Sequence, residues 1–204
     1  MSETMSNRVL MGITGASGAI YGRALLDELT RLDVEVHLIV SPTSHIVIRE
    51  ELGITFPGGR FDPEVYLGRA VPRGRIVMHS DGDLAAPPAS GTFRCAGMVI
   101  CPCSMKTLGT LAAGTGSNLV TRAAEACLKE RRRLVVVPRE TPLSLIHLRN
   151  MVTLTEAGAI VLPAMPGFYH RPQTIDELVR HLVLKILDAL GLRHTISYRW
   201  KDPD

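Results

Sequence analysis

Short apolar runs alternate with amphipathic stretches along most of the sequence, and this alternation constrains the fold more than any other feature. The apolar runs are expected to be strands, at residues 9–13, 34–40, 75–79, 98–101, 134–137 and 159–162. Continuous apolar strands are typical of parallel sheets that helices cover on both faces. The sequence therefore predicts an α/β fold: a three-layer α/β/α, Rossmann-like (flavodoxin-like) arrangement with a parallel sheet.

Segments with helical spacing of apolar residues separate most of these strands. We expect helices at residues 19–32, 43–52, 106–113, 119–130, 143–156 and 175–190. Residues 53–74 mix Gly, Pro and charged residues with little periodicity, so they are expected to form a loop. Because the sequence has no internal repeat or low-complexity linker, residues 1–204 are interpreted as one domain.

Composition excludes several other classes of protein. A hydrophobic content of 46% with 21% charged residues is ordinary for a globular chain and excludes intrinsic disorder. A net charge of +3 is too small to indicate a nucleic-acid partner. No apolar run approaches the roughly 18 residues that a membrane helix needs. Four cysteines do not form a secreted disulfide framework and no signal segment opens the chain, so a cytoplasmic location is expected.

Several loops follow predicted strands, and ligands of α/β sheets bind at the carboxyl ends of the strands. The first loop, residues 14–22, is rich in glycine and opens a helix, where unpaired amides can hold an anion. It matches neither the dinucleotide-binding pattern nor the Walker pattern. A tight turn capped by Ser17 is an equally good interpretation, and Ser41 after the second strand is best interpreted as a helix cap if it acts alone.

The loops after the fourth and fifth predicted strands contain more side chains that could bind a ligand or take part in a reaction. Residues 101–107 supply hydroxyl groups and backbone amides for a flavin or a phosphate. The pair Cys101 and Cys103 lacks the other ligands of a zinc site, so both are expected to be buried hydrophobes. Arg139 can hold phosphate and Glu140 can transfer a proton, although Glu140 can also simply stabilise a helix N-terminus.

The last candidate loop spans residues 163–172 and contains three prolines and two of the nine aromatic residues. Tyr169 can donate a hydrogen bond to a phosphate while Phe168 packs; a surface loop with one buried ring is the alternative. Arg122 and Lys129 lie seven positions apart and therefore share a helix face, for which a solvated basic stripe is the ordinary interpretation.

Four motifs, taken together and in order, closely resemble the flavin prenyltransferases of the UbiX type. They are GASGAIYG at 15–22, PCSMKT at 102–107, RETPL at 139–143 and PGFYHRP at 166–172. The resemblance runs from about residue 8 to the C-terminal region. It implies transfer of a dimethylallyl group from dimethylallyl phosphate to N5 and then C6 of reduced FMN, without a metal. The product, prenylated FMN, is the cofactor of a UbiD-type decarboxylase, in ubiquinone synthesis or in phenolic acid decarboxylation.

The resemblance also assigns roles to individual residues. FMN would contact Gly15, Ala16, Ser17, Ser41, Ser104, Met105, Lys106, Thr107, Arg122 and Arg139. The prenyl donor would meet Lys129, Arg139, Tyr169 and Lys185, with Trp200 as a site-lining aromatic, and Glu140, Ser17 and Glu51 would form the proton relay. Lys185 stands where family members often carry Arg, which keeps the charge but loses the bidentate fork. In the family, neighbouring subunits of a dodecamer complete the site, so a homo-oligomer, a dodecamer, is expected.

Two other functions are consistent with parts of the sequence. A related FMN-dependent cysteine decarboxylase would share the flavin-binding architecture. Such enzymes carry an early catalytic His and a Pro-x-Met-Asn element, neither of which stands at the matching positions here. A flavin-binding module without catalysis would bind FMN but leave the basic residues dispersed.

Overall fold

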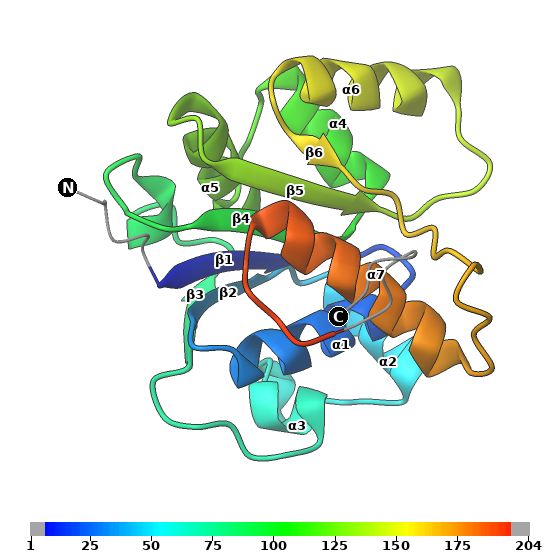
Figure 1. Cartoon of the computed structure of the whole chain (residues 1–204). Coiled ribbons are helices and arrows are strands. Elements are labelled where there is room, and N and C mark those ends of the chain that lie inside the picture. Colours follow the sequence, from blue (N-terminus) through cyan, green and yellow to red (C-terminus); the bar gives the residue numbers. More distant parts are fainter. Residues whose placement is uncertain (1–6, 197–204) are drawn as a thin grey trace.

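A six-stranded parallel sheet forms the centre of the computed structural model, which describes residues 7–196 (Figure 1). Its strands are β1 (Arg8–Ile13), β2 (Glu35–Val40), β3 (Ile76–Ser80), β4 (Gly97–Cys103), β5 (Arg133–Pro138) and β6 (Ile160–Val161). They lie in the order β3-β2-β1-β4-β5-β6, and each neighbouring pair is parallel. The six predicted strands and the predicted parallel sheet are confirmed.

Helices cover both faces of the sheet. They are α1 (Ala19–Arg31), α2 (Ser44–Leu52), α3 (Pro63–Leu67), α4 (Met105–Ala113), α5 (Leu119–Lys129), α6 (Leu145–Glu156) and α7 (Ile175–Leu190). Helices α1, α2, α3 and α7 pack on one face, and α4, α5 and α6 pack on the other (Figure 1). The predicted three-layer α/β/α arrangement is therefore confirmed.

Helix α3 lies within residues 53–74, which the sequence predicted as a loop. With five residues, the helix is too short to show a helical period of apolar positions. Its signal is local: Pro63 occupies the first turn, and the Asp62 carboxylate accepts hydrogen bonds from the amides of Glu64 and Val65. The sequence Asp62-Pro63 is the only local signal of this cap, and it lies outside any helical period of apolar residues.

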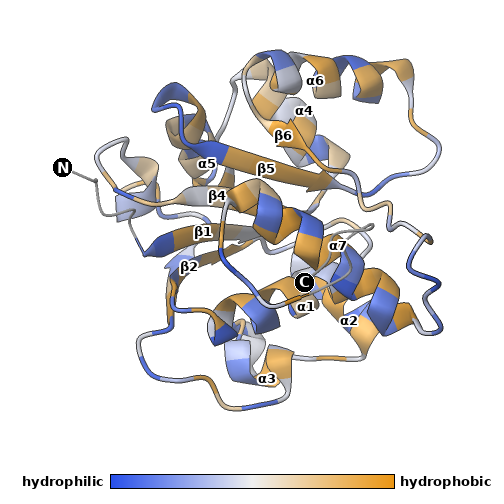
Figure 2. Ribbon diagram, viewed as in Figure 1, coloured by the Kyte–Doolittle hydropathy of each residue, from blue (hydrophilic) through white to orange (hydrophobic). Residues whose placement is uncertain are grey.

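Alternation along each strand divides the hydrophobic core into two clusters. In β1, Val9, Met11 and Ile13 pack with α1 and α7, whereas Leu10 packs with the helices of the opposite face. Figure 2 shows β1 and β5 as largely hydrophobic ribbons between these layers. Because the sheet is buried on both faces, polar groups gather at the two ends of its strands.

The chain leaves the sheet in opposite directions after β1 and after β4, so a crevice opens between their carboxyl ends. Thr14 joins the loops on either side of this crevice. Its Oγ1 donates to the Pro102 carbonyl oxygen at 2.9 Å and accepts from the Ser104 amide at 2.8 Å. Thr14 is buried, so these bonds are protected from competing water.

Replacing Thr14 by Val tests this connection. The Thr14→Val variant keeps a similar shape but removes the acceptor of the Ser104 amide. Leaving a buried polar group without its partner costs about 1–3 kcal/mol. We expect the free energy of unfolding, measured by urea titration, to fall by about that amount. Thr14→Ser retains the hydroxyl and should lose less, and equal losses in the two variants would contradict a role for the hydroxyl.

Candidate active site

The loop after β1 ends at a helix whose first amides bind a carboxylate from another helix. Gly18 is the N-cap residue of α1 and has a φ of 105°, a conformation that favours glycine. The carboxylate of Glu51, in α2, accepts from the Gly18 amide at 2.9 and 3.1 Å and from the Ala19 amide at 2.8 Å. The alternative in which Ser17 caps this helix is therefore wrong, because Gly18 takes the cap position and Glu51 supplies the acceptor.

Ser17, Glu51 and Arg139 meet at the start of α1. The Ser17 side chain hydrogen-bonds to the Glu51 carboxylate, and Arg139 Nε donates to the Ser17 carbonyl oxygen at 3.2 Å. Burial alone would raise the pKa of Glu51. The bonds from Ser17 and from the two amides, with the nearby charge of Arg139, outweigh burial and hold this pKa below its usual value. Glu51 is therefore an ionised acceptor at neutral pH.

The loop after β2 packs tightly against the loop after β1. A Cβ at Gly15 would lie 2.6 Å from Thr43 Oγ1, so the position requires glycine. Thr43 Oγ1 is in turn 3.1 Å from Ser41 Oγ. The N-cap of α2 is Thr43 and no side chain caps it, so the interpretation of Ser41 as a cap is wrong. Sequence reasoning missed Thr43, whose only signal was a hydroxyl residue close to Ser41.

The loop after β4 brings a third set of hydroxyl groups to the same edge. Ser104 caps α4 by accepting from the Thr107 amide at 3.2 Å, and the two hydroxyl oxygens are 2.9 Å apart. Cys101 and Cys103 are fully buried, as expected, and burial raises the pKa of both thiols. Thr14, which ties this loop to β1, was not among the predicted site residues.

The loop after β5 contributes a cation and a carboxylate. Arg139 is half-buried, whereas Glu140 is exposed. Helix α6 begins at Leu145 with Ser144 as its cap, so the alternative that places Glu140 at the helix N-terminus is wrong. A cavity of about 410 Å³ opens beside them. It is lined by Pro138, Arg139, Glu140, Thr141, Leu143, Met151, Pro163, Ala164 and Met165.

Tyr169 and Lys185 lie beside a buried histidine that sequence reasoning missed. The Tyr169 hydroxyl oxygen is 2.9 Å from Nε2 of His181, and the Gly167 amide donates to Nδ1 of the same ring at 3.1 Å. Lys185 follows His181 by one helical turn in α7, on the same face. Burial, then the charges of His170 and Lys185, lower the pKa of His181. The only signal of His181 in the sequence was this spacing from Lys185.

Two of the predicted basic residues, Arg122 and Lys129, lie in α5. Arg122 lies in the first turns of α5 and pairs with Glu125 at 3.0 Å. Lys129 ends the same helix, pairs with Glu130 and precedes β5, whereas Arg139 follows β5. The six residues of β5 span about 20 Å, so Lys129 and Arg139 stand at opposite edges of the sheet. Within a single chain, Lys129 and Arg139 are therefore separated by the length of β5.

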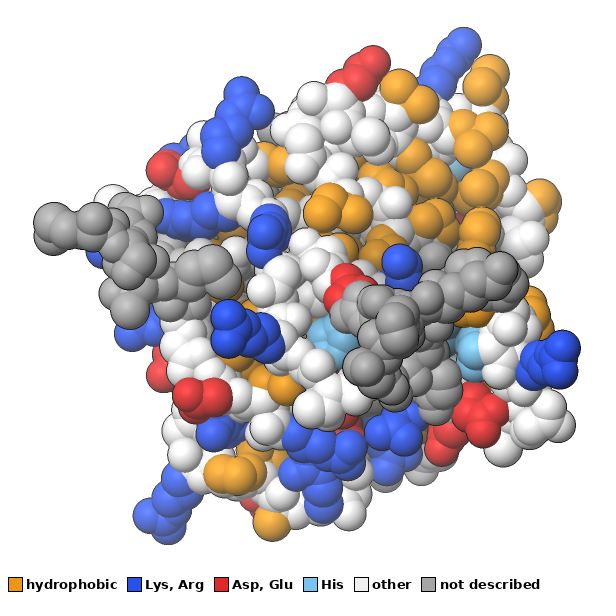
Figure 3. All heavy atoms as spheres, viewed as in Figure 1, with side chains coloured by type: hydrophobic (Ala, Val, Ile, Leu, Met, Phe, Trp, Pro, Cys, Tyr) orange, Lys and Arg blue, Asp and Glu red, His pale blue; other side chains and the backbone are white. Residues whose placement is uncertain are grey.

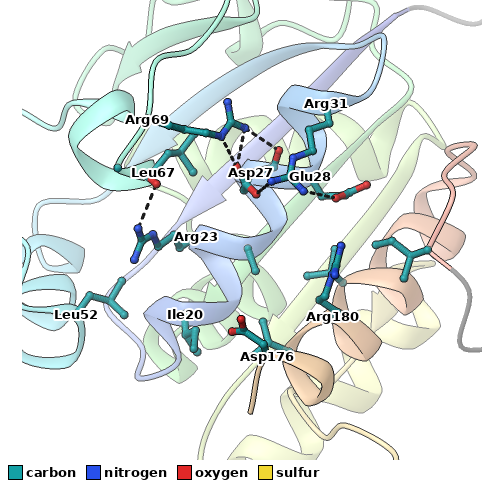
Figure 4. Close-up of a pocket in the computed structure, with 15 residues that line it drawn as sticks. Ile20, Arg23, Asp27, Glu28, Arg31, Leu52, Leu67, Arg69, Asp176 and Arg180 are labelled. Atoms are coloured by element: carbon teal, nitrogen blue, oxygen red, sulfur yellow. Dashed lines mark hydrogen bonds and ion pairs between the residues drawn. The ribbon is translucent and has the colours of Figure 1, made fainter. Parts of the chain in front are cut away.

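A second cavity, of about 540 Å³, lies between α1, α3 and α7 (Figure 4). None of the predicted site residues lines it. Its arginines are largely engaged: Asp27 pairs with Arg31 at 2.7 Å and with Arg69 at 2.6 Å, and Arg23 donates to the Leu67 carbonyl oxygen at 3.1 Å. The loops at the carboxyl ends of the strands therefore remain the better candidate site.

Neither a metal site nor a membrane-spanning helix is found in residues 7–196. Within this range no three His, Cys, Asp or Glu side chains are grouped as ligands of a metal ion. No helix in it combines the length and the apolar character that are needed to cross a membrane. Trp200, which the resemblance placed in the site, lies outside the described residues.

The Glu51 bonds predict an acid-sensitive contribution to stability. The pKa of Glu51 is lower in the folded state than in the unfolded state. Its bonds therefore contribute their full stability at pH values above the unfolded-state pKa, about 4.3 for Glu. This contribution to stability is lost as the pH falls through the folded-state pKa. In urea titrations, the stability difference between wild type and Glu51→Gln should therefore be constant above about pH 5 and shrink below about pH 4. Glu50→Gln, which alters the adjacent exposed carboxylate that pairs with Arg49, is the control. A Glu51→Gln difference that is equal at acid and neutral pH would exclude this role.

Known proteins share this chain's sequence and its fold over almost the whole length. Residues 1–186 match the Flavoprotein family. The flavin prenyltransferase UbiX of Alkalihalophilus pseudofirmus is 48% identical over 200 residues, which cover 98% of this chain and 99% of that protein.

Two solved structures are similar at comparable coverage. AnUbiX (PadA1), in complex with FMN and dimethylallyl pyrophosphate, is 38% identical with a TM-score of 0.80 and covers 95% of this chain and 100% of its own. A dodecameric FMN-dependent UbiX-like decarboxylase from Escherichia coli O157:H7 is 41% identical with a TM-score of 0.82, over 96% of this chain and 100% of its own. The chain therefore belongs to the Flavoprotein family and, within it, to the UbiX flavin prenyltransferases.

Proposed function

We propose that this chain transfers a dimethylallyl group from dimethylallyl phosphate to reduced FMN. The position of Arg139 is the observation that carries the proposal. Its side chain contacts the loop after β1 through Ser17 and also lines the 410 Å³ cavity with Glu140. A cation and a carboxylate thus stand between a crevice suited to a flavin and a cavity with apolar walls, as transfer of an apolar group from a phosphate requires.

The residues around the crevice fit FMN as a substrate. Reduced FMN supplies the two nucleophilic ring atoms, N5 and C6. Small side chains and accessible backbone allow a planar ring to approach closely, and hydroxyl groups of three loops can orient it. In this proposal FMN is held by Gly15, Ala16, Ser17, Ser41, the run 104–107, Arg122 and Arg139.

Departure of the phosphate requires stabilisation of the charge that develops as the allylic C–O bond breaks. Arg139 and Lys185 supply positive charge, and the Tyr169 hydroxyl supplies a hydrogen-bond donor. Lys129 stands at the opposite edge of the sheet of its own chain, so it would act in the site of a neighbouring subunit. A site divided in this way depends on assembly.

Two carboxylates take different parts in proton transfer. Bond formation at C6 of the flavin requires that carbon to lose a proton, and Glu140, exposed and lining the same cavity as Arg139, can accept it. Glu51 stays ionised and accepts from Ser17, so it orients the Ser17 hydroxyl toward proton exchange near N5. Trp200 is proposed to line the site beside the flavin.

An apolar surface supports assembly into a homo-oligomer, which we propose is a dodecamer. Figure 3 shows hydrophobic side chains gathered over α6 and the loop beside it. In α6, Leu154 is the buried residue of the helix, while Leu145, Ile146, Leu148 and Val152 are exposed. The neighbouring loop adds exposed Met165 and Phe168. A contiguous apolar patch of this kind marks a protein–protein interface.

The cellular setting of the proposed enzyme follows from its thiols and its product. All four cysteines are free, as is usual in the reducing cytoplasm, where we propose that this protein acts as a single domain. Prenylated FMN has its use as a cofactor in a second enzyme. We propose a UbiD-type decarboxylase as the recipient.

Mass spectrometry of the flavin tests the proposed activity. Protein incubated anaerobically with reduced FMN and dimethylallyl phosphate should yield a flavin heavier than FMN by one prenyl group. Dimethylallyl pyrophosphate is the comparison donor. Recovery of unchanged FMN with both donors, from protein that binds FMN, would refute the transferase and leave a flavin-binding module.

The Glu140→Gln variant tests the role of Glu140 in the same assay. It should bind FMN with wild-type affinity but form the adduct more slowly, by about 100-fold, the usual contribution of a general base. Wild-type turnover by this variant would remove Glu140 from the mechanism. Release of carbon dioxide from a peptidyl cysteine would favour the alternative decarboxylase.

Light scattering after size-exclusion chromatography tests the assembly. Ile146 is 69% exposed on α6, so Ile146→Glu should leave the subunit folded but reduce the oligomeric mass, because it buries a charge in the apolar interface. Leu84→Glu, at a residue 51% exposed outside α6, should retain the wild-type mass. An unchanged mass for Ile146→Glu would exclude this face as an interface.

A further inference from the structure

The ring of His181 has a defined proton position. Its side chain is 5% exposed, and Nδ1 accepts the Gly167 amide hydrogen at 3.1 Å. A backbone amide can only donate, so Nδ1 carries no proton, and the proton of the neutral ring is on Nε2. Burial and the charges of His170 and Lys185 lower the pKa of this ring, which keeps it neutral near pH 7.

This proton position determines the direction of the next hydrogen bond. Nε2 lies 2.9 Å from the Tyr169 hydroxyl oxygen. Because Nε2 carries the proton, it donates and the tyrosine oxygen accepts. A phenol that accepts at its oxygen directs its own hydrogen to a different acceptor. Tyr169 is therefore set as a donor by a group outside its own loop.

The ring of His181 is also fixed in orientation. His170 stacks on it with ring centroids 5.0 Å apart, and Tyr169 packs edge-on with centroids 5.3 Å apart. Lys185 lies one turn further along α7 on the same face as His181, and its charge is near enough to lower the pKa of this ring. An anion bound by Lys185 would find a donor at Tyr169.

We propose that His181 is a positioning residue that fixes the Tyr169 hydroxyl as a hydrogen-bond donor to the phosphate of the prenyl donor. The inference rests on the proposed function, because that function places phosphate at Tyr169. His181 does not touch the substrate. It acts through Tyr169, and Gly167 sets its tautomer.

Two substitutions separate the two bonds of His181. His181→Gln places an amide donor near the position of Nε2, so it can still donate to Tyr169 but loses the acceptor for Gly167. His181→Asn places an acceptor near the position of Nδ1, so it can still bind Gly167 but loses the donor to Tyr169. Both variants replace the buried ring with an amide, so they share the structural cost of the change.

The assay compares KM for dimethylallyl phosphate with the dissociation constant of FMN. We expect His181→Asn to raise this KM about tenfold, the size of one hydrogen bond to a charged group, and His181→Gln to raise it less. FMN affinity should remain that of the wild type in both. Equal KM values for Asn and Gln, with an active wild type, would overturn the inference.

A double-mutant cycle with Tyr169→Phe shows whether His181 acts through Tyr169. In the Tyr169→Phe background, His181→Asn should cause no further increase in KM, whereas independent roles would multiply the two effects. The second result would overturn the inference.

A spectroscopic measurement does not depend on turnover. Solid-state ¹⁵N spectra of histidine-labelled protein, assigned by the signal lost in His181→Gln, should show a neutral ring with its proton on Nε2. A charged ring or a proton on Nδ1 would refute the inference. If the tautomer is as expected and the wild type forms no adduct, the proposed function fails instead.

Discussion

Burial of both faces of the parallel sheet is the constraint on which the other features depend. With β1 and β4 covered by helices, polar chemistry can lie only where strands end, and strand order opens a crevice between these two strands. The helices that follow run back along the sheet, so residues at the two ends of one helix reach opposite edges. That geometry alone brings Ser17 to Arg139 across 122 positions and sends Lys129 away from both. The direction of the strands therefore decides which cations one chain can assemble.

At the start of α1, a carboxylate of the protein itself binds the amides that could otherwise hold an anionic ligand. Unpaired amides at a helix N-terminus attract negative charge, and here the Glu51 carboxylate satisfies those of Gly18 and Ala19. A phosphate of FMN would compete with Glu51 for the same amides. This helix start consequently suits the uncharged flavin ring better than the phosphate. The ionised state of Glu51 is part of the same arrangement, because its hydrogen bonds outweigh its burial.

The sequence predicted the fold more completely than the partners of individual side chains. The ends of the predicted strands and of the helices with a clear period lie within about two residues of the observed ends, because burial imposes the apolar pattern directly on the sequence. Glu51 lies 33 positions from Gly18, and His181 lies 12 from Tyr169; neither pairing follows from local spacing. Ser17 and Ser41 were plausible caps by residue type, yet Gly18 and Thr43 occupy the cap positions. Local rules describe which residues can cap, whereas the fold decides which of them do.

Two features of the single chain have a common explanation in assembly. Helix α6 exposes four large apolar side chains, and Lys129 carries its charge to the edge opposite Arg139. Association through α6 would remove apolar area from water, which is favourable in itself. If the same association brings the Lys129 of one subunit to the Arg139 of another, the free energy of assembly also holds two positive charges together at the proposed phosphate site. A bound anion offsets their mutual repulsion, so substrate binding and subunit association reinforce one another.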